Sequence, residues 1–140
     1  MPLTRREIDD FLRRPNIAVV ATVGADGQPH AVPTWYDYDG GEIVLHMGPR
    51  SRRYHNMRSN DRVAICVDTK SPPYMAVVVQ GHARTKLGRD DRRSRRMAIR
   101  YLGKELGARY ADSIRGSRMV IARVLPEKIV SWDYGRGDNP

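Results

Sequence analysis

Short, β-branched segments separated by Asp-Gly turns most constrain the fold of this chain. The first segment, residues 16–23 (NIAVVATV), precedes a turn at Asp26-Gly27, and residues 30–38 (HAVPTWYDY) precede a second turn at residues 39–41 (DGG). Asp-Gly pairs favour the tight turns that connect antiparallel strands. The pattern predicts strands over 16–23, 30–38 and 42–47 (EIVLHM), paired in order as an antiparallel meander.

Two local signals refine the first half of the chain. Thr4 and Glu7 form a capping-box pattern ahead of apolar residues at helical spacing, which predicts a short opening helix that ends before Pro15. Pro33 has no N–H group for a sheet ladder. The second strand is therefore expected at a sheet edge, at a bulge or near its own end.

The second half of the chain continues the alternation of strands and helices. The expected elements are a helix over 53–60, strands over 62–68 and 74–87, a helical region over 89–116 and two strands over 117–134. Gly81 marks a bulge or bend in the long strand. Gly103 and Gly107 interrupt the helical region, and Pro126 separates the last two strands.

This pattern predicts a mainly β fold with small helices. Six or seven short strands leave exposed edges unless the sheet closes, so a closed or nearly closed antiparallel barrel is expected. The chain has 140 residues. That length suits one domain, residues 1–140, with a core of its own.

Composition narrows the class of protein. The apolar fraction is 40%, the charged fraction is 29%, and no apolar run approaches the length of a membrane span. The amino terminus lacks the apolar stretch of a signal peptide, and the single cysteine, Cys66, cannot form an internal disulfide. We expect a cytoplasmic protein in which Cys66 is a buried core thiol.

The net charge of +9 favours a polyanionic partner, such as nucleic acid, anionic lipid or a phosphorylated or polycarboxylated ligand. The basic run at residues 92–96 (RRSRR) has Asp90 and Asp91 beside it and no interleaved aromatic residues, which argues against nucleic-acid binding. The four histidines show no paired ligand spacing. No metal site and no membrane contact are expected.

A cluster of arginines suggests where an anion binds. Arg50, Arg52 and Arg53 surround Ser51 between an expected strand and an expected helix. Free N–H groups and the helix dipole at such a junction favour an anion, and arginine offers bidentate hydrogen bonds to phosphate. A solvated basic loop is the alternative interpretation.

The segment GPRSRRYHNMRSNDRVAI, residues 48–65, resembles the Ser-Arg-Lys motif and following helix of the pyridoxamine-phosphate oxidase-like split β-barrels. The resemblance covers most of residues 8–87, with SWDY near the carboxyl terminus as further support. It implies a Greek-key, FMN-binding-like split barrel. It also implies that Ser51, Arg52 and Arg53 hold a cofactor phosphate, with Arg53 where lysine is more common.

The same resemblance implies the rest of the cofactor site. The second strand lines the cofactor ring, the end of the third strand faces the same groove, and homodimers carry two cofactors at their interface. Trp132 would then reach the partner's cofactor. The candidate cofactor-binding residues are Val32, Pro33, Thr34, Trp35, His46, Met47, Gly48, Arg50, Ser51, Arg52, Arg53 and Trp132.

The family includes users of flavin mononucleotide (FMN), users of the 8-hydroxy-5-deazaflavin coenzyme F420, and haem binders. The oxidase branch usually carries a ring-contacting glutamine where this chain has Ala76, and its substrate-binding arginine and histidine have no counterpart at the carboxyl terminus. Vitamin-B6 oxidase activity is therefore not expected. The segments PTWYDYDGG, RYLG and VSWDY look more like the deazaflavin branch.

The resemblance thus implies a reductase that transfers hydride between coenzyme F420 and an unidentified organic small molecule. An electropositive groove with Arg58 and His55 at its edge would suit the phosphodiester and polyglutamate tail of that coenzyme. No essential acid-base residue is expected, and Tyr36, Tyr38 and His46 are interpreted as packing or surface residues. The alternatives are an FMN-dependent oxidoreductase, a non-catalytic flavin, deazaflavin or haem binder, and a basic nucleic-acid-binding barrel.

Overall fold

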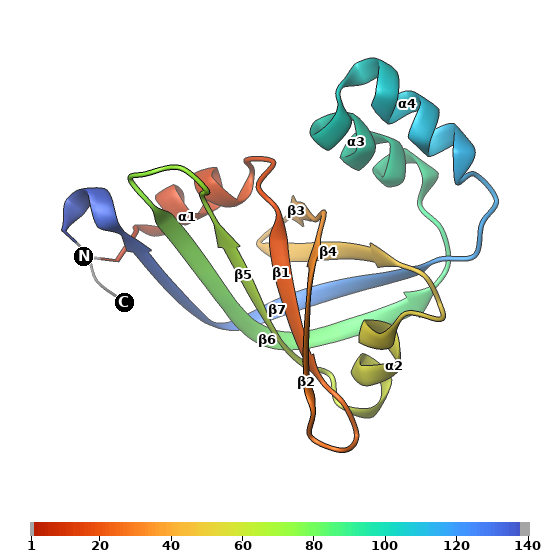
Figure 1. Cartoon of the computed structure of the whole chain (residues 1–140), viewed down its shortest axis with the longest axis horizontal. Helices are drawn as coiled ribbons and strands as arrows, with labels where there is room; N and C mark the ends of the chain where they lie inside the picture. The colour runs from red at the N-terminus through yellow and green to blue at the C-terminus, as the bar shows by residue number, and fades with distance from the viewer. Residues whose placement is uncertain (1, 138–140) are drawn as a thin grey trace.

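The computed structural model describes residues 2–137 and shows one antiparallel sheet that curls into a barrel (Figure 1). Within these residues seven strands follow the order β2-β1-β5-β6-β7-β4-β3. The strands are β1 (Ala18–Val23), β2 (Pro29–Thr34), β3 (Asp37–Asp39), β4 (Glu42–Met47), β5 (Arg62–Asp68), β6 (Met75–Leu87) and β7 (Val120–Asp133). The helices are α1 (Arg5–Leu12), α2 (Arg52–Ser59), α3 (Asp91–Leu102) and α4 (Lys104–Ser113). A short 3-10 turn, η1 (Tyr134–Arg136), follows β7.

The two edges of the sheet lie close together because a very short connection joins them. Strands β2 and β3 are the edge strands, and only Trp35 and Tyr36 separate them in the chain. A connection of that length spans at most about 10 Å even when fully extended. The sheet is therefore a nearly closed, split barrel, and the predicted mainly β fold is confirmed.

The predicted meander of three strands is wrong in one respect. The expected strand over 30–38 breaks at Trp35 and Tyr36, so that its first half pairs with β1 and its second half pairs with β4. Tyr36 is fully buried at the break. Pro33 lies on the edge strand β2, where no neighbouring strand requires its N–H group, as predicted.

The core fills the barrel and extends under α1. The helix begins after Thr4, whose side chain accepts a hydrogen bond from the N–H of Glu7, and the Glu7 side chain accepts one from the N–H of Thr4, so the predicted capping box is confirmed. Ile8, Phe11 and Leu12 place the apolar face of α1 against the core.

The long strands β6 and β7 pair along their whole length, with a register shift between Gln80 and Gly81. A Cβ atom on Gly81 would lie 2.0 Å from the carbonyl oxygen of Leu125, so the predicted bulge requires glycine. The predicted separation into two strands at Pro126 is wrong. Strand β7 is continuous because Pro126 sits opposite Gly81 at the irregularity.

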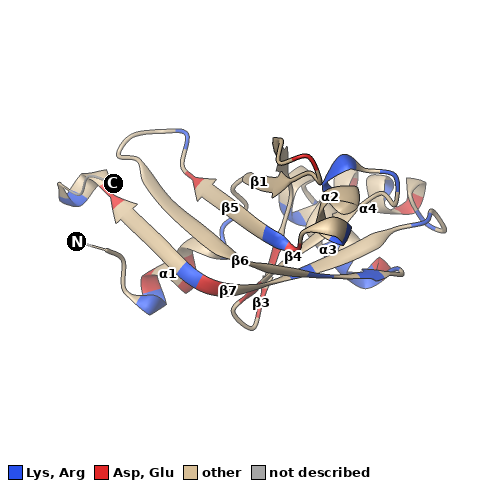
Figure 2. Ribbon diagram, turned by 90° about the horizontal axis from the view of Figure 1, so that it is seen from below, with Lys and Arg blue, Asp and Glu red and all other residues tan. Residues whose placement is uncertain are grey.

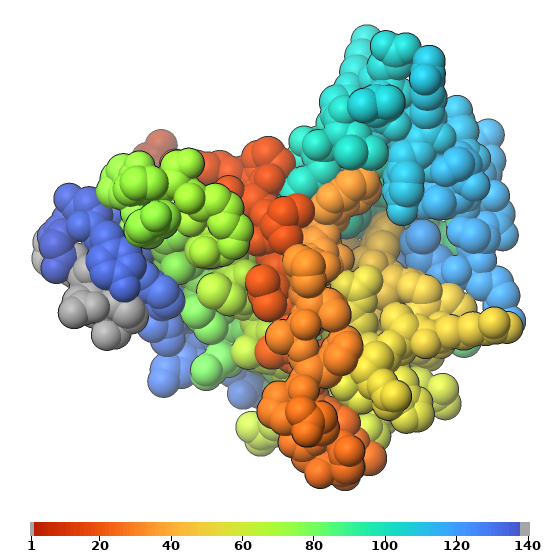
Figure 3. All heavy atoms as spheres, in the orientation of Figure 1, coloured from red at the N-terminus to blue at the C-terminus, as the bar shows by residue number. Residues whose placement is uncertain are grey.

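Helices α3 and α4 form a hairpin that projects from the barrel (Figures 1 and 3). Gly103, with a φ of 86°, separates the two helices as predicted. The predicted interruption at Gly107 is wrong, because this residue lies inside α4. A Cβ atom there would meet the backbone of Ile99 at 2.5 Å, so Gly107 allows the two helices to approach closely.

The expectation that Cys66 lies in the core is also wrong. Its neighbours Ile65 and Val67 are fully buried inside the barrel, whereas Cys66 is half-buried on the outer face of β5. Burial raises the pKa of its thiol.

In residues 2–137, no helix combines the length and apolar character required to cross a membrane.

Candidate cofactor site

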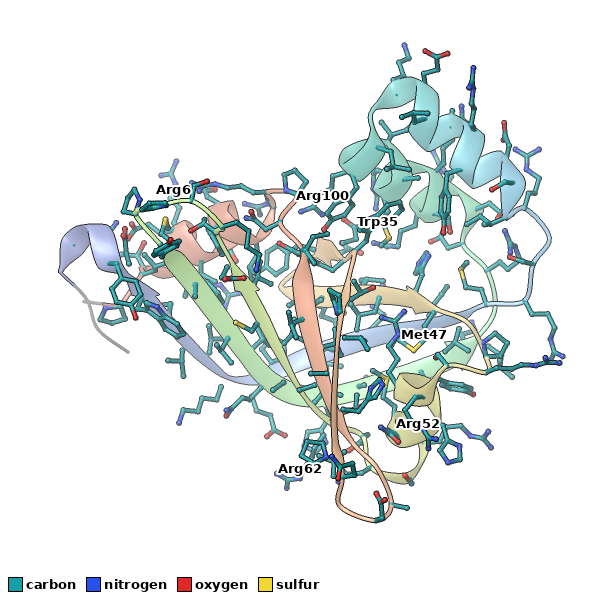
Figure 4. All side chains as sticks on the ribbon, in the orientation of Figure 1. Arg6, Trp35, Met47, Arg52, Arg62 and Arg100 are labelled. Atoms are coloured by element: carbon teal, nitrogen blue, oxygen red, sulfur yellow. The ribbon has the colours of Figure 1, made fainter. Side chains whose placement is uncertain are left out.

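A cleft of about 420 Å³ lies between the barrel and the helical hairpin. Strand β4 provides its floor, the end of β2 and the start of α2 provide its sides, and α3 and α4 cover it. Trp35 and Met47 lie on this side of the barrel (Figure 4). The cleft is lined by Thr34, Trp35, His46, Met47, Gly48, Arg53, Ser94, Met97, Tyr110, Ile114 and Met119.

The structure brings part of the predicted site together in this cleft. The predicted residues that line it are Thr34, Trp35, His46, Met47, Gly48 and Arg53. Val32 and Pro33 lie on the same strand as Thr34 but do not line the cleft. Trp132 lies at the opposite end of β7 from Met119, about 40 Å along the strand, so any contact with a cofactor would require a partner chain.

Three further members of the predicted site, Arg50, Ser51 and Arg52, line a second cleft of about 500 Å³. It is lined by Pro49, Arg50, Ser51, Arg52, Tyr54, His55 and Arg58. The turn between β4 and α2 separates the two clefts, with Arg53 on one side and Arg52 on the other. The short segment that carries the basic motif therefore contributes to both.

Arg53 is a half-buried cation for which residues 2–137 provide no ion-pair partner. Its Nη1 atom is buried and makes no hydrogen bond, and no described carboxylate forms an ion pair with it. Burial lowers the pKa of its guanidinium, but arginine remains charged in proteins. A buried charge without a partner is unfavourable, so this position suits an anion.

Ser51 shapes the beginning of α2. Its Oγ donates a hydrogen bond to the carbonyl oxygen of Gly48 at 2.8 Å and accepts one from the N–H of Tyr54 at 3.4 Å. Ser51 is therefore the N-cap of α2, which fixes the turn geometry. The first N–H groups of α2 point out of the helix end, where its dipole favours negative charge.

In contrast, Arg93 and Arg96 of α3 are engaged in ion pairs with the barrel. Arg93 and Arg96 donate hydrogen bonds to Oδ2 of Asp37 at 2.5 and 2.7 Å, and Arg93 also donates to Asp39 at 3.0 Å. Asp37 is 8% exposed. The basic run at residues 92–96 therefore anchors the hairpin to β3. Asp90, one of the partners expected from the sequence, contributes mainly as the N-cap of α3.

Basic residues are frequent around α2, α3 and α4 (Figure 2). Their environments differ, since Arg93 and Arg96 of α3 pair with a carboxylate of the barrel, whereas Arg53 and Arg58 of α2 line the clefts. Arg100 belongs to the anchored group, because it donates hydrogen bonds to the carbonyl oxygens of Tyr36 and Leu12 at 3.0 and 3.2 Å. The arginines that line the two clefts are therefore the ones whose charge can meet a ligand there.

Aromatic residues complete the contact between the hairpin and the barrel. The ring of Trp35 stacks on that of Tyr101 with centroids 5.1 Å apart, and Tyr110 meets it edge-on at 5.4 Å. The hydroxyl of Tyr101 donates to the carbonyl oxygen of Asn16 at 2.8 Å. Trp35 is thus a fixed wall of the cleft.

Tyr36 and Tyr38, interpreted from the sequence as packing or surface residues, do not line the cleft and have structural roles. The Tyr36 hydroxyl donates to the carbonyl oxygen of Leu12 at 2.7 Å, and burial raises its pKa far above the usual range. The Tyr38 hydroxyl donates to a carboxylate oxygen of Asp9 at 2.5 Å. Both hydroxyls are therefore engaged away from the cleft.

His46 differs from these tyrosines because it faces the cleft. Its neighbours Leu45 and Met47 point into the core, so its ring projects from the outer face of β4 toward α3. Its Nδ1 lies 3.1 Å from Oγ of Ser94, and its Nε2 is buried without a partner. Burial and then the charge of Arg93 lower the pKa of His46, which keeps the ring neutral at neutral pH.

Sequence reasoning missed the hairpin side of the cleft. The missed lining residues are Ser94, Met97, Tyr110, Ile114 and Met119. Helical spacing places Ser94 and Met97 on one face of α3, and Tyr110 lies four residues before Ile114. The helical spacing of these residues predicts that one face of the hairpin is buried. It does not predict that this face covers β4.

The described residues contain no group of three or more His, Cys, Asp or Glu side chains placed to hold a metal ion. The donor set of the first cleft, which combines one free guanidinium, a neutral imidazole and apolar walls, suits an organic anion with an extended apolar part.

The sheet order, the basic turn between β4 and α2, and the adjoining cleft define a protein of the split β-barrel class. A family profile described as pyridoxamine 5'-phosphate oxidase matches residues 4–133. The chain belongs to the pyridoxamine 5'-phosphate oxidase family.

Comparison with individual proteins agrees with this assignment. The 5a,11a-dehydrotetracycline/5a,11a-dehydrooxytetracycline reductase of Streptomyces rimosus is 35% identical over 141 aligned residues, which cover 94% of this chain and 84% of the relative. Among solved structures, the conserved hypothetical protein Rv2991 of Mycobacterium tuberculosis has a TM-score of 0.78 and 25% identity, with coverage of 99% and 89%. A structure named F420 reductase has a TM-score of 0.69 and 24% identity, with coverage of 86% and 94%.

The anchor of the hairpin can be tested by replacing Asp37 with Asn. The substitution removes the carboxylate charge shared by Arg93 and Arg96, and it should lower the free energy of unfolding by about 2 kcal/mol, because charge-assisted hydrogen bonds to a buried carboxylate are lost. Trp35 fluorescence should also change as the hairpin loosens. Asp112→Asn is the control, since its pairs with Arg95 and Arg115 are exposed.

The same anchor predicts an acid transition. Burial alone would raise the pKa of Asp37, but the hydrogen bonds and charges of Arg96 and Arg93 outweigh it and hold the pKa below its usual value. The stabilisation is therefore complete above about pH 4, the range of an unfolded aspartate, and is lost as pH falls below it. Denaturant titrations at several pH values should show that the free energy of unfolding falls less on acidification in Asp37→Asn than in the wild type. An equal dependence on pH in the two proteins would contradict this role.

Proposed function

We propose that this oxidoreductase binds the deazaflavin coenzyme F420 and transfers hydride between it and a small organic substrate. The observation that carries the proposal is the unpaired Arg53 beside the N-terminus of α2, at the mouth of a cleft with apolar walls. A phosphate group at the turn formed by Ser51, Arg52 and Arg53 would give Arg53 the partner it lacks. The coenzyme ring would then extend into the cleft over β4.

The second cleft favours the deazaflavin over FMN. FMN ends at its phosphate, whereas the deazaflavin coenzyme continues into a tail of glutamate carboxylates. Arg50, Arg52 and Arg58 line the second cleft on the other side of the phosphate turn, and none of the three forms an ion pair with a described residue. These cations are placed to receive the carboxylates of such a tail.

The relatives support the same activity. The Streptomyces rimosus relative is named as a reductase, and one solved structure of the same fold is named F420 reductase. When bound, such a coenzyme supplies a hydride from its ring, while the protein supplies binding, orientation and exclusion of water. Met97, Ile114 and Met119 form an apolar wall on the hairpin side, which suits an apolar organic substrate beside the ring.

We also propose that the protein is a homodimer. Val19, Cys66, Val78 and Val130 pair across β1, β5, β6 and β7 and form a row on the outer face of the sheet. Val130 is 38% exposed, and Trp132 lies two residues farther along the same strand and therefore on the same face. A second copy on this row would cover it and bring Trp132 toward the partner, as the family resemblance implies.

Replacement of Arg53 by Ala tests the phosphate site. The dissociation constants for coenzyme F420 and for FMN should both rise ten- to a hundredfold, the order expected for one buried charge-assisted contact. Quenching of tryptophan fluorescence in the apo-protein measures both. Arg95→Ala is the matched control, because Arg95 lies outside both clefts on the exposed side of α3. Unchanged affinity in Arg53→Ala would remove this residue from the site.

Replacement of Arg58 by Ala tests the tail site. Arg58 is exposed and stacks on Tyr54 with its guanidinium 5.6 Å from the ring centroid. Affinity for the tail-bearing coenzyme should fall about two- to fivefold, the size of an exposed charge contact, and the loss should shrink with added salt. FMN affinity should not change. Arg62→Ala, an exposed arginine outside the second cleft, provides the control.

Replacement of Val130 by Asp tests the dimer. A carboxylate in an apolar interface loses its hydration without gaining a partner, so the variant should sediment as a monomer at concentrations where the wild type is a dimer. Because Val130 is partly exposed in the single chain, circular dichroism should show an intact fold. A variant that remains dimeric would place the interface elsewhere.

A further inference from the structure

We propose that His46 donates a hydrogen bond from Nε2 to a carbonyl oxygen of the coenzyme ring, and that Ser94 holds the imidazole in the tautomer that can donate. The inference rests on the proposed function for the identity of the ligand. The tautomer itself is a property of the chain alone. His46 would be the ligand-contacting residue and Ser94 a positioning residue.

The position of His46 is set by the barrel. On β4 the side chains of Leu45 and Met47 enter the core, which directs the ring of His46 to the opposite face and into the cleft. Gly48 and the turn that leads to Arg53, at the start of α2, follow directly along the chain. A ligand with its anionic group at Arg53 and its ring along β4 must pass His46.

The hydrogen bonds of Ser94 decide which nitrogen of His46 carries the proton. The Ser94 hydroxyl has one hydrogen, and two acceptors compete for it: His46 Nδ1 at 3.1 Å and the sulfur of Met119, to which Ser94 Oγ is also placed to donate, at 3.9 Å. An imidazole nitrogen is a much stronger acceptor than a thioether sulfur, so we assign the hydroxyl hydrogen to Nδ1. A neutral ring that accepts at Nδ1 carries its hydrogen on Nε2.

The Nε2 atom is therefore a donor that the protein leaves without an acceptor. It is buried, and no described protein atom accepts a hydrogen bond from it. Buried polar groups are almost always hydrogen-bonded, so a buried donor without an acceptor, on a residue that lines a cleft, points to a ligand. A carbonyl oxygen of a ring is the matching acceptor, because a neutral imidazole offers no net charge for a carboxylate.

The surrounding charges keep the imidazole neutral. Burial is the largest effect that lowers the pKa of His46; Arg93 and Arg89 also oppose protonation, whereas Asp90 and Asp37 favour it. Because Asp37 is itself paired with Arg93 and Arg96, its charge is largely compensated. Burial under the hairpin, together with the charge of Arg93, thus keeps the cleft histidine neutral.

Nuclear magnetic resonance of the histidine side chains tests the tautomer in the apo-protein. Long-range correlations between ring protons and nitrogens in a ¹⁵N-histidine sample distinguish the two tautomers, and the chain has only four histidines. The resonance that disappears in His46→Phe identifies His46. We expect the Nε2–H tautomer in the wild type and in Ser94→Thr, and a loss of that preference in Ser94→Ala. An Nδ1–H tautomer in the wild type would overturn the proposal.

Titration with oxidised coenzyme F420 and, separately, with FMN tests the contact. His46 Nε2 should shift on binding and His82 should not, because His82 lies outside the cleft between Asp61 and Glu127. His46→Phe should weaken coenzyme binding by about two- to tenfold, the order of one neutral hydrogen bond. Binding that quenches tryptophan fluorescence but leaves the His46 resonances unmoved would overturn the contact. No quenching by either coenzyme would overturn the proposed function, whereas the tautomer result would stand independently.

Discussion

The two-residue connection between β2 and β3 is the constraint on which the rest of the structure depends. Because Trp35 and Tyr36 alone join the two edges of the sheet, the sheet must curl until those edges nearly meet. Asp37 follows at once, and its buried carboxylate attracts Arg93 and Arg96 of α3. Closure of the barrel and docking of the hairpin therefore originate at one corner, where the cleft also begins.

That arrangement separates two populations of arginines near the clefts. Arg93 and Arg96 of α3 form ion pairs with Asp37, and Arg93 also pairs with Asp39, so these arginines act as structural anchors. Those of the turn before α2 and of α2 itself have no acidic partner among the described residues, and they surround two clefts. A net charge alone cannot distinguish these populations, because the distinction depends on which carboxylates the fold brings within reach. The unpaired population is the one that bears on ligand binding.

The limits of sequence reasoning are clearest at particular residues. The capping box at Thr4 and the bulge at Gly81 were predictable because a few neighbouring residues determine each of them. The break at Trp35 was not, since residues 30–38 have an unbroken strand pattern and only closure of the barrel bends them. At Pro126 the sequence pattern predicts a strand end that does not occur, because the bulge on the neighbouring strand accommodates the proline. Gly107 lies inside α4 and allows that helix to pack closely against α3. This role depends on the nearby backbone of Ile99, which is distant from the local sequence signal.

The sequence by itself determined the alternation of strands and helices, the barrel class and the position of the basic turn, because those properties depend on neighbouring residues and on spacing along the chain. Tertiary structure decided which arginines stay unpaired and which residues of the hairpin cover the cleft. It determined which half of the strand predicted over residues 30–38 pairs with β4. It also decided that His46 meets Ser94, two residues 48 positions apart in the chain. Such contacts arise from the closure of the sheet and the packing of the hairpin, which local sequence does not encode.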